Sequence, residues 1–339
     1  MVTASAPGKV ILFGEHAVVY DKLGIACSFD KRCQVKTSIL DQDFVSIKTK
    51  SLNLNKSMQK KDLFFFLNKI NDLIEKKQFE EINKIFKEDE LSPSFFVVAN
   101  ILNKYGFKGL EIEVNSDVPK NLGSSSAVFS ALTLSVVRVL EKNVSKEEIS
   151  NFAYLGDIIA HGGTPSGIDN NIVTYGGYLQ YQKSKGIKVL DIDFKIPLLI
   201  INSGEEARTG EMVSYVRNKK EQSPEMVNAV LKSLDDLSKK ALVGLKNQNL
   251  HIVGKLMNRY YQELRKLDIS TKKLDQIVEI ALRNNVLGVK PTGGWGGGCC
   301  LALMEKEEEL EKLINVFNRE GFHSFVGKIG VEGVKIISK

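Results

Sequence analysis

Five of the six positions from 293 to 298 are glycine, and no other segment constrains the fold of this 339-residue chain as strongly. Glycine loses more conformational freedom on folding than any other residue, so a run of glycines is costly to order. A compact protein keeps such a run where its backbone must approach a ligand or another strand closely. We therefore expect a strand–loop–strand unit over 288–304. Its loop serves a binding site or, as the structural alternative, forms a hairpin bulge.

A second segment of small residues, 121–127, leads into a continuous apolar stretch at 128–140 that predicts a buried helix. Backbone N–H groups at a helix N-terminus form an anion site, and here Gly123 and three serines open the helix. A serine hydroxyl at this point could also reach Mg²⁺ bound to a phosphate. The segment therefore predicts a phosphate site. The simpler alternative, a serine N-cap, needs only one serine.

Charged residues interrupt the apolar segment near the N-terminus. Lys9 precedes the apolar residues 10–13, and Glu15 and His16 follow them. Because a buried charge needs a partner, Lys9 is expected to pair with another group, unless its ammonium reaches solvent from the strand end.

Asp157 and Asp169 flank a turn that contains glycine and proline. One of them could ligate a metal while the other acts as a catalytic carboxylate. The alternative is that each accepts hydrogen bonds within its own turn, as aspartate commonly does.

Several common classes are excluded. None of the three Gly-Lys pairs has the glycine spacing and the following Ser or Thr of a P-loop, and the protein-kinase and GxGxxG signatures are absent. The four histidines match no zinc signature. The 47 basic and 41 acidic residues give a net charge of only +6, with lysines scattered among glutamates, so we expect no nucleic-acid partner.

The chain is expected to be cytoplasmic. Its apolar runs are far shorter than the ~18 residues of a membrane span, so we expect no membrane partner. The apolar stretch near the N-terminus is too short for a secretory signal. The four cysteines show no CxxC spacing and are interpreted as reduced packing residues rather than nucleophiles.

Two α+β halves are expected, 1–185 and 186–339. Hydrophobic periodicity predicts helices at 61–74, 211–219, 224–246, 249–265 and 271–284, and strands at 187–193 and 198–202. Ser145 and Glu148 resemble a capping box that opens another helix.

Taken in order, four segments resemble the GHMP family of small-molecule kinases and, within it, the branch that phosphorylates mevalonate. They are 7–20, 122–127, 165–170 and 290–299, and the first and third of these are the most specific. The resemblance implies a ribosomal-protein-S5-like N-terminal domain, a ferredoxin-like C-terminal domain, and ATP and substrate in the cleft between them. The sequence departs from the usual motifs of this family at three places: the loop before Leu122 is shorter, Trp295 stands in place of glycine, and Asp157 stands in place of glutamate.

The resemblance also implies residue roles. Lys9 and Asp169 would be catalytic, with Asp169 accepting or orienting the proton of the 5-hydroxyl of mevalonate. ATP would be bound by Lys9, Asn121, Leu122, Gly123, Ser124, Ser125, Ser126 and Ala127. The substrate would be bound by Lys9, Glu15, His16, Asp169 and Thr209. Mg²⁺ would be held by Ser125 and Asp157.

The implied partners are therefore ATP and mevalonate, and a homodimer stays open. The nearest alternative is another kinase of the family, such as a phosphomevalonate kinase. A diphosphomevalonate decarboxylase is disfavoured by the residues around Lys9. An inactive, ligand-sensing relative is disfavoured because Lys9 and Asp169 are both present.

Overall fold

The computed structural model describes residues 1–163, 165–207 and 209–338. Its larger sheet has eight strands, six of them in the order β12-β1-β2-β5-β3-β4, while β6 pairs with β2 and with β7. These strands are β1 (Val2–Phe13), β2 (Gly24–Leu40), β3 (Phe44–Thr49), β4 (Leu54–Gln59), β5 (Gly109–Ser116), β6 (Tyr178–Gln182), β7 (Gly186–Leu190) and β12 (Lys335–Ser338). Only β3 and β5 pair in parallel, and the other pairs are antiparallel.

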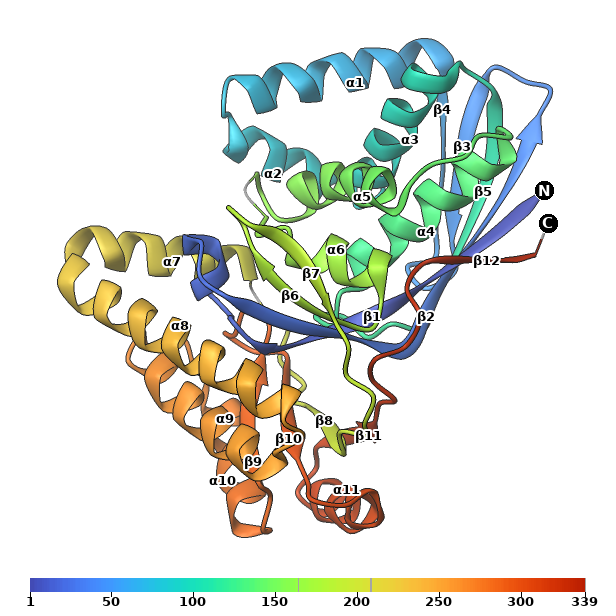
Figure 1. The fold of residues 1–339 in the computed structure, drawn as a ribbon. Coiled ribbons are helices and arrows are strands. Elements are labelled where there is room, and N and C mark those ends of the chain that lie inside the picture. Colours follow the sequence, from blue (N-terminus) through green and yellow to red (C-terminus); the bar gives the residue numbers. More distant parts are fainter. Residues whose placement is uncertain (164, 208, 339) are drawn as a thin grey trace.

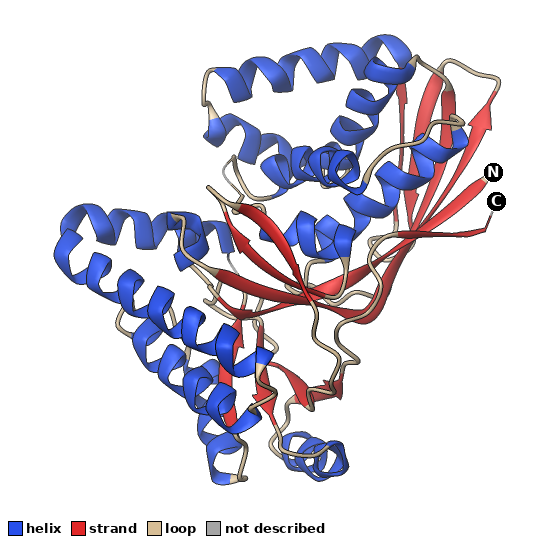
Figure 2. Cartoon of the chain, viewed as in Figure 1, coloured by secondary structure: helices blue, strands red, loops and turns tan. Residues whose placement is uncertain are grey.

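Helices cover one face of this sheet (Figures 1 and 2). They are α1 (Lys60–Glu75), α2 (Phe79–Glu88), α3 (Ser92–Tyr105), α4 (Ser124–Val139), α5 (Lys146–Ala160) and α6 (Ile168–Tyr175), and a short 3-10 helix, η1 (Ala17–Tyr20), follows β1. The apolar helix α4 packs directly on β1 and β2, which explains why its sequence is apolar on nearly every side. Its N-terminus therefore lies close to the strand that carries Lys9.

The smaller sheet has four antiparallel strands in the order β11-β8-β10-β9. They are β8 (Leu198–Asn202), β9 (Gly288–Thr292), β10 (Cys299–Leu303) and β11 (His323–Val326). Its helices are α7 (Thr209–Gln222), α8 (Pro224–Lys246), α9 (Leu250–Arg265), α10 (Lys272–Arg283) and α11 (Leu310–Arg319), with a 3-10 turn, η2 (Glu307–Glu309), before α11. Helices α9 and α10 pack on β9, and α9 also contacts β1, so the two sheets meet through these elements.

The expected strand–loop–strand unit and helices are confirmed, and Ser145 caps α5 by accepting a hydrogen bond from the Glu148 amide at 3.1 Å. The division into 1–185 and 186–339 stays a prediction. Strands β6 and β7 form a hairpin inside the larger sheet, so a boundary at residue 185 would cut a single hairpin. We propose that the first domain continues to about residue 190. The chain end was not expected to return, yet β12 pairs with β1 and brings the termini together (Figure 1). No described helix is long and apolar enough to span a membrane.

Candidate active site

Lys9 and Asp169 form an ion pair at the centre of the site. Nζ of Lys9 lies 2.9 Å from Oδ2 of Asp169, and the Lys9 side chain is buried while the Asp169 side chain is 23% exposed. Lys9 comes from β1, whereas Asp169 lies in the first turn of α6, after Gly167 in a left-handed conformation. The pair therefore presents one carboxylate oxygen and a fixed positive charge to a partly open site.

The small-residue segment 121–127 packs against the same lysine. The amide of Lys9 donates to the carbonyl of Leu122 at 2.8 Å. A Cβ on Gly123 would lie 2.5 Å from Cγ of Lys9, so only glycine allows this approach. Helix α4 begins at Ser124, directly after Gly123. The amides of its first turn are thus available to an anion beside the Lys9 ammonium.

The glycine-rich loop closes the other side of this segment. A Cβ on Gly293 would lie 3.7 Å from the Asn121 carbonyl oxygen, and one on Gly298 would lie 3.6 Å from Cβ of Asn121. These are ordinary contacts, and the close approach that the composition predicted occurs at two other glycines of the loop. A Cβ on Gly294 would lie 2.4 Å from Oγ1 of Thr209, and one on Gly297 would lie 2.7 Å from the Glu206 carbonyl oxygen.

The serines of the α4 N-terminus differ in their surroundings. Ser125 is exposed, whereas Ser126 is buried and donates to both carboxylate oxygens of Asp157 at 2.8 Å. Ser126 was expected at ATP, but its hydroxyl is directed to Asp157. The exposed side chain of Ser125, in the first turn of α4, is accessible for the predicted metal role.

Asp157 is a buried carboxylate in α5. Burial raises its pKa to about 7, and the negative charge of Asp169 adds to the rise, while His161, Ser126 and Lys9 oppose it. The Ser126 hydroxyl that holds Asp157 comes from the first turn of α4, the helix that begins after Gly123 beside Lys9. A cation bound here would favour the ionised carboxylate.

Two of the five predicted substrate residues, His16 and Thr209, meet at Gly294. His16 donates through Nε2 to the Gly294 carbonyl at 2.9 Å, and a Cβ on Gly294 would lie 2.4 Å from Oγ1 of Thr209. Burial lowers the pKa of His16 to about 4, so the imidazole is neutral at pH 7. Glu15 is fully buried next to it and forms an ion pair with Lys290.

The pattern of motifs alone did not single out Lys290, Thr292 and Tyr260. Lys290 pairs with Glu15, Oγ1 of Thr292 exchanges hydrogen bonds of 3.0 Å with the backbone of Ile11, and the phenol of Tyr260 accepts from the Gly14 amide at 2.9 Å. The sequence did contain one signal for the buried ion pair: Lys290 lies in an apolar segment, and a buried charge needs a partner.

Trp295 packs in the interior against α9. It is fully buried at φ 62° and stacks on Tyr261 with ring centroids 5.8 Å apart. Its indole thus anchors the glycine-rich loop on α9. The four cysteines are buried and free, and burial raises the pKa of Cys299 to about 12, in agreement with a packing role.

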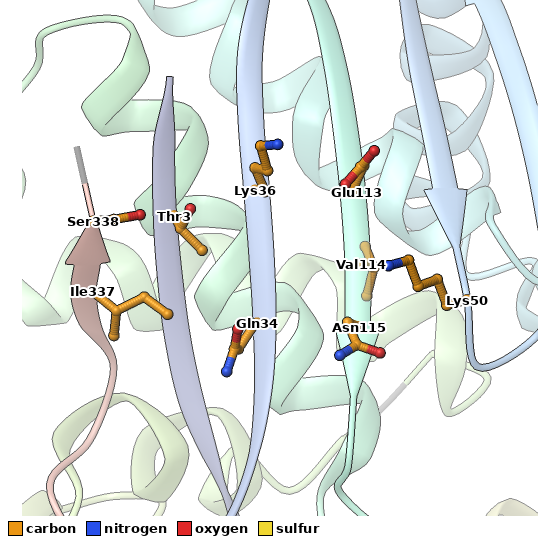
Figure 3. Close-up of a pocket in the computed structure, with 9 residues that line it drawn as sticks. All are labelled: Thr3, Gln34, Lys36, Lys50, Glu113, Val114, Asn115, Ile337 and Ser338. Carbon is orange, nitrogen blue, oxygen red and sulfur yellow. The ribbon is translucent and has the colours of Figure 1, made fainter.

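A shallow hollow elsewhere does not contain the Lys9–Asp169 pair. It has a volume of about 330 Å³ and lies over β12, β1, β2 and β5 (Figure 3). Its lining residues are Thr3, Gln34, Lys36, Lys50, Glu113, Val114, Asn115, Ile337 and Ser338. We place the active site at the Lys9–Asp169 pair, where the N-termini of α4 and α6 meet, because none of the residues that line this hollow lies in a helix.

A lysine–aspartate pair, a helix N-terminus and a glycine-rich loop between two α+β domains define a small-molecule kinase, and the chain belongs to the GHMP kinase family. The GHMP kinase N-terminal domain matches residues 94–177, and the GHMP kinase C-terminal domain matches residues 241–323. The expected fold class is thereby confirmed.

Within the GHMP family, the chain is similar over its full length to mevalonate kinases. The mevalonate kinase of Thermococcus onnurineus is 32% identical over 99% of this chain and 98% of its own length. The mevalonate kinase of Pyrococcus furiosus is 30% identical, with the same coverage of both chains. The crystal structure of the Methanococcus jannaschii mevalonate kinase has a TM-score of 0.79 and 26% identity, and it covers 96% of this chain and 98% of the other.

Proposed function

We propose that this kinase transfers the γ-phosphoryl group of ATP to the 5-hydroxyl of mevalonate. Full-length similarity to mevalonate kinases supports the substrate. The observation that carries the chemistry is the 2.9 Å contact between Lys9 and Asp169 beside the N-terminus of α4.

Asp169 would accept or orient the proton of the substrate hydroxyl, since its carboxylate is the partly exposed member of the pair. Lys9 would stabilise negative charge on the attacking oxygen and on the transferring phosphoryl group. Holding both reactants in line supplies much of the catalysis, because phosphoryl transfer asks little covalent chemistry of the protein.

ATP phosphates would bind at the N-terminus of α4, where the first-turn amides lie beside Lys9. Asn121, Leu122, Gly123, Ser124, Ser125, Ser126 and Ala127 form this segment. Of these, Ser126 would act through its hydrogen bonds to Asp157 rather than through its hydroxyl on the nucleotide.

The oxygen donors of this site fit Mg²⁺, which prefers carboxylate and hydroxyl ligands. Asp157 and Ser125 would hold the ion, and a divalent cation supplies charge neutralisation to the phosphates. The Asp157 carboxylate is buried, accepts from Ser126 on both oxygens and has its Oδ1 3.9 Å from Nδ1 of His161, so a cation bound here would favour its ionised form.

Glu15, His16 and Thr209 would contact mevalonate. The contacts of His16 and Thr209 with Gly294, and the position of Glu15 next to His16 in the chain, support this role. The neutral imidazole of His16 would orient a substrate oxygen without adding charge.

A coupled ADP-release assay tests the proposal. We expect turnover of mevalonate at about 1–100 s⁻¹, the common range for kinases. Phosphomevalonate, homoserine and galactose serve as parallel substrates. Turnover of phosphomevalonate without turnover of mevalonate would assign the chain to the other branch.

A further inference from the structure

Lys290 is buried in β9, and its side chain contacts the segment that carries Glu15. Its Nζ donates to Oε1 of Glu15 and to the Ile11 carbonyl at 3.4 Å, and it lies 5.5 Å from the centre of the Tyr260 ring. Both charged side chains of the Lys290–Glu15 pair are 0% exposed. Burying two charges costs desolvation energy, so stability alone is a weak reason for this pair, which favours a functional role.

The second oxygen of the Glu15 carboxylate has no hydrogen-bond donor among the described residues. This oxygen, Oε2, is buried. A buried pair that only ties two domains together is stabilised when its remaining lone pairs are satisfied by the protein. Glu15 instead keeps one strong acceptor for a donor that is not part of the fold.

The neighbours of Glu15 indicate where that donor comes from. His16 follows it directly and is bound to Gly294 beside Thr209. Glu15 is therefore adjacent in the chain to the His16–Gly294–Thr209 contacts, where we propose that the substrate binds.

Groups other than Lys290 also hold the backbone of this segment. Tyr260 bonds the Gly14 amide and donates to the Glu15 carbonyl at 3.3 Å, and Thr292 bonds both backbone groups of Ile11. Lys290 is thus the one described side chain that hydrogen-bonds the Glu15 carboxylate, so its effect on Glu15 can be separated from the docking of the domains.

We propose that Lys290 is a positioning residue for substrate recognition: by occupying Oε1 of Glu15, it presents Oε2 as the acceptor for a hydroxyl group of the alcohol substrate. This inference rests on the proposed function, because it assigns Glu15 to the substrate of that same site. Lys290 itself touches neither substrate nor nucleotide.

The test compares Lys290→Met, Glu15→Gln and the double variant with a matched control, Thr292→Val. The control removes the other β9 side chain that ties the strand to Ile11, yet it leaves Glu15 and Lys290 in place. Steady-state kinetics give KM for mevalonate and for ATP separately, calorimetry gives the Kd of mevalonate, and thermal unfolding reports the fold.

We expect Lys290→Met to raise KM and Kd for mevalonate by about tenfold to hundredfold, the usual effect of losing a charge-assisted hydrogen bond. KM for ATP should change less than about threefold. Because Lys290 acts through Glu15, the double variant should bind mevalonate within about twofold of Glu15→Gln alone. Thr292→Val should lower the unfolding temperature while KM for mevalonate stays within about threefold of the wild-type value.

Equal rises in the KM values of ATP and mevalonate in Lys290→Met, or a double variant that is additively worse, would overturn the proposal. If Lys290→Met does not fold, the comparison of Glu15→Gln with the double variant still decides, since removal of both buried charges is commonly tolerated. If wild-type protein phosphorylates another alcohol, the proposed substrate fails, but the same variants measured on that alcohol still test Lys290.

Discussion

Lys9 of β1 and Asp169 of α6 form a 2.9 Å ion pair in which the lysine is buried and the aspartate is partly exposed. Lys9 also contacts the segment that precedes α4: its amide donates to the Leu122 carbonyl, and Gly123 packs against its side chain. One lysine thus joins the predicted phosphate loop to the predicted catalytic carboxylate.

If the two residues act as one unit, Lys9→Met and Asp169→Asn should each lower kcat by roughly 10²–10⁴. The double variant should be little worse than the worse single variant, since residues that act together show non-additive effects. Single-turnover kinetics at saturating ATP and mevalonate measure this. A kcat near the wild-type value in Asp169→Asn would remove that residue from the catalytic role.

The metal assignment predicts a change in Mg²⁺ dependence. Asp157→Ala and Ser125→Ala should each raise the Mg²⁺ concentration for half-maximal rate and lower kcat, because each removes an oxygen ligand. Asp157→Glu should retain substantial activity. Mg²⁺ titrations at fixed ATP measure the effect. An unchanged Mg²⁺ dependence and kcat in Asp157→Ala would show that Asp157 is not a ligand.

The raised pKa of Asp157 predicts how stability depends on pH in the absence of metal and nucleotide. Since its pKa is 3.8 in the unfolded reference and about 7 in the fold, the folded state binds this proton more tightly. Its contribution to the free energy of unfolding is therefore complete below pH 4 and is lost as the pH rises to 7. Asp157→Asn should be more stable than wild type at pH 8, on the order of 1 kcal/mol or more, and lose this advantage by pH 4.

Urea unfolding of both proteins in EDTA from pH 4 to pH 8 measures this difference. Subtraction of the wild-type values removes the contributions of other buried groups, such as Glu15 and His16. A difference that does not vary with pH would contradict a buried carboxylate whose pKa is raised in the folded state.

His16 should stay neutral where free imidazoles titrate. Burial lowers its pKa from 6.5 to about 4, so the unfolded state takes up this proton first and stability falls as the pH drops from 6.5 toward 4. In ¹⁵N NMR spectra the His16 ring should show an Nε2-protonated neutral form from pH 6 to pH 8, because Nε2 donates to the Gly294 carbonyl. His16→Gln assigns the signal, and a midpoint near 6.5 for that signal would refute the prediction.

Local chemistry made much of the fold predictable. The apolar stripe at 61–74 corresponds to α1, and the capping residue Ser145 marks the start of α5, because both signals act within a few residues along the chain. By contrast, β12 pairs with β1 from the opposite end of the sequence. Its short segment carries no local feature that specifies this partner.

Residue types and spacing alone pointed to the candidate residues of the site: Lys9, Asp169, the serines at 124–126 and the glycines at 293–298. Their partners depended on the packing of the folded chain. It turned Ser126 rather than Ser125 toward Asp157, buried Trp295 against Tyr261, and placed Lys290 on Glu15. The reason is physical: residue type sets what a group can donate, accept or ionise, but burial and distance set what it meets, and these depend on how strands and helices remote in sequence pack together.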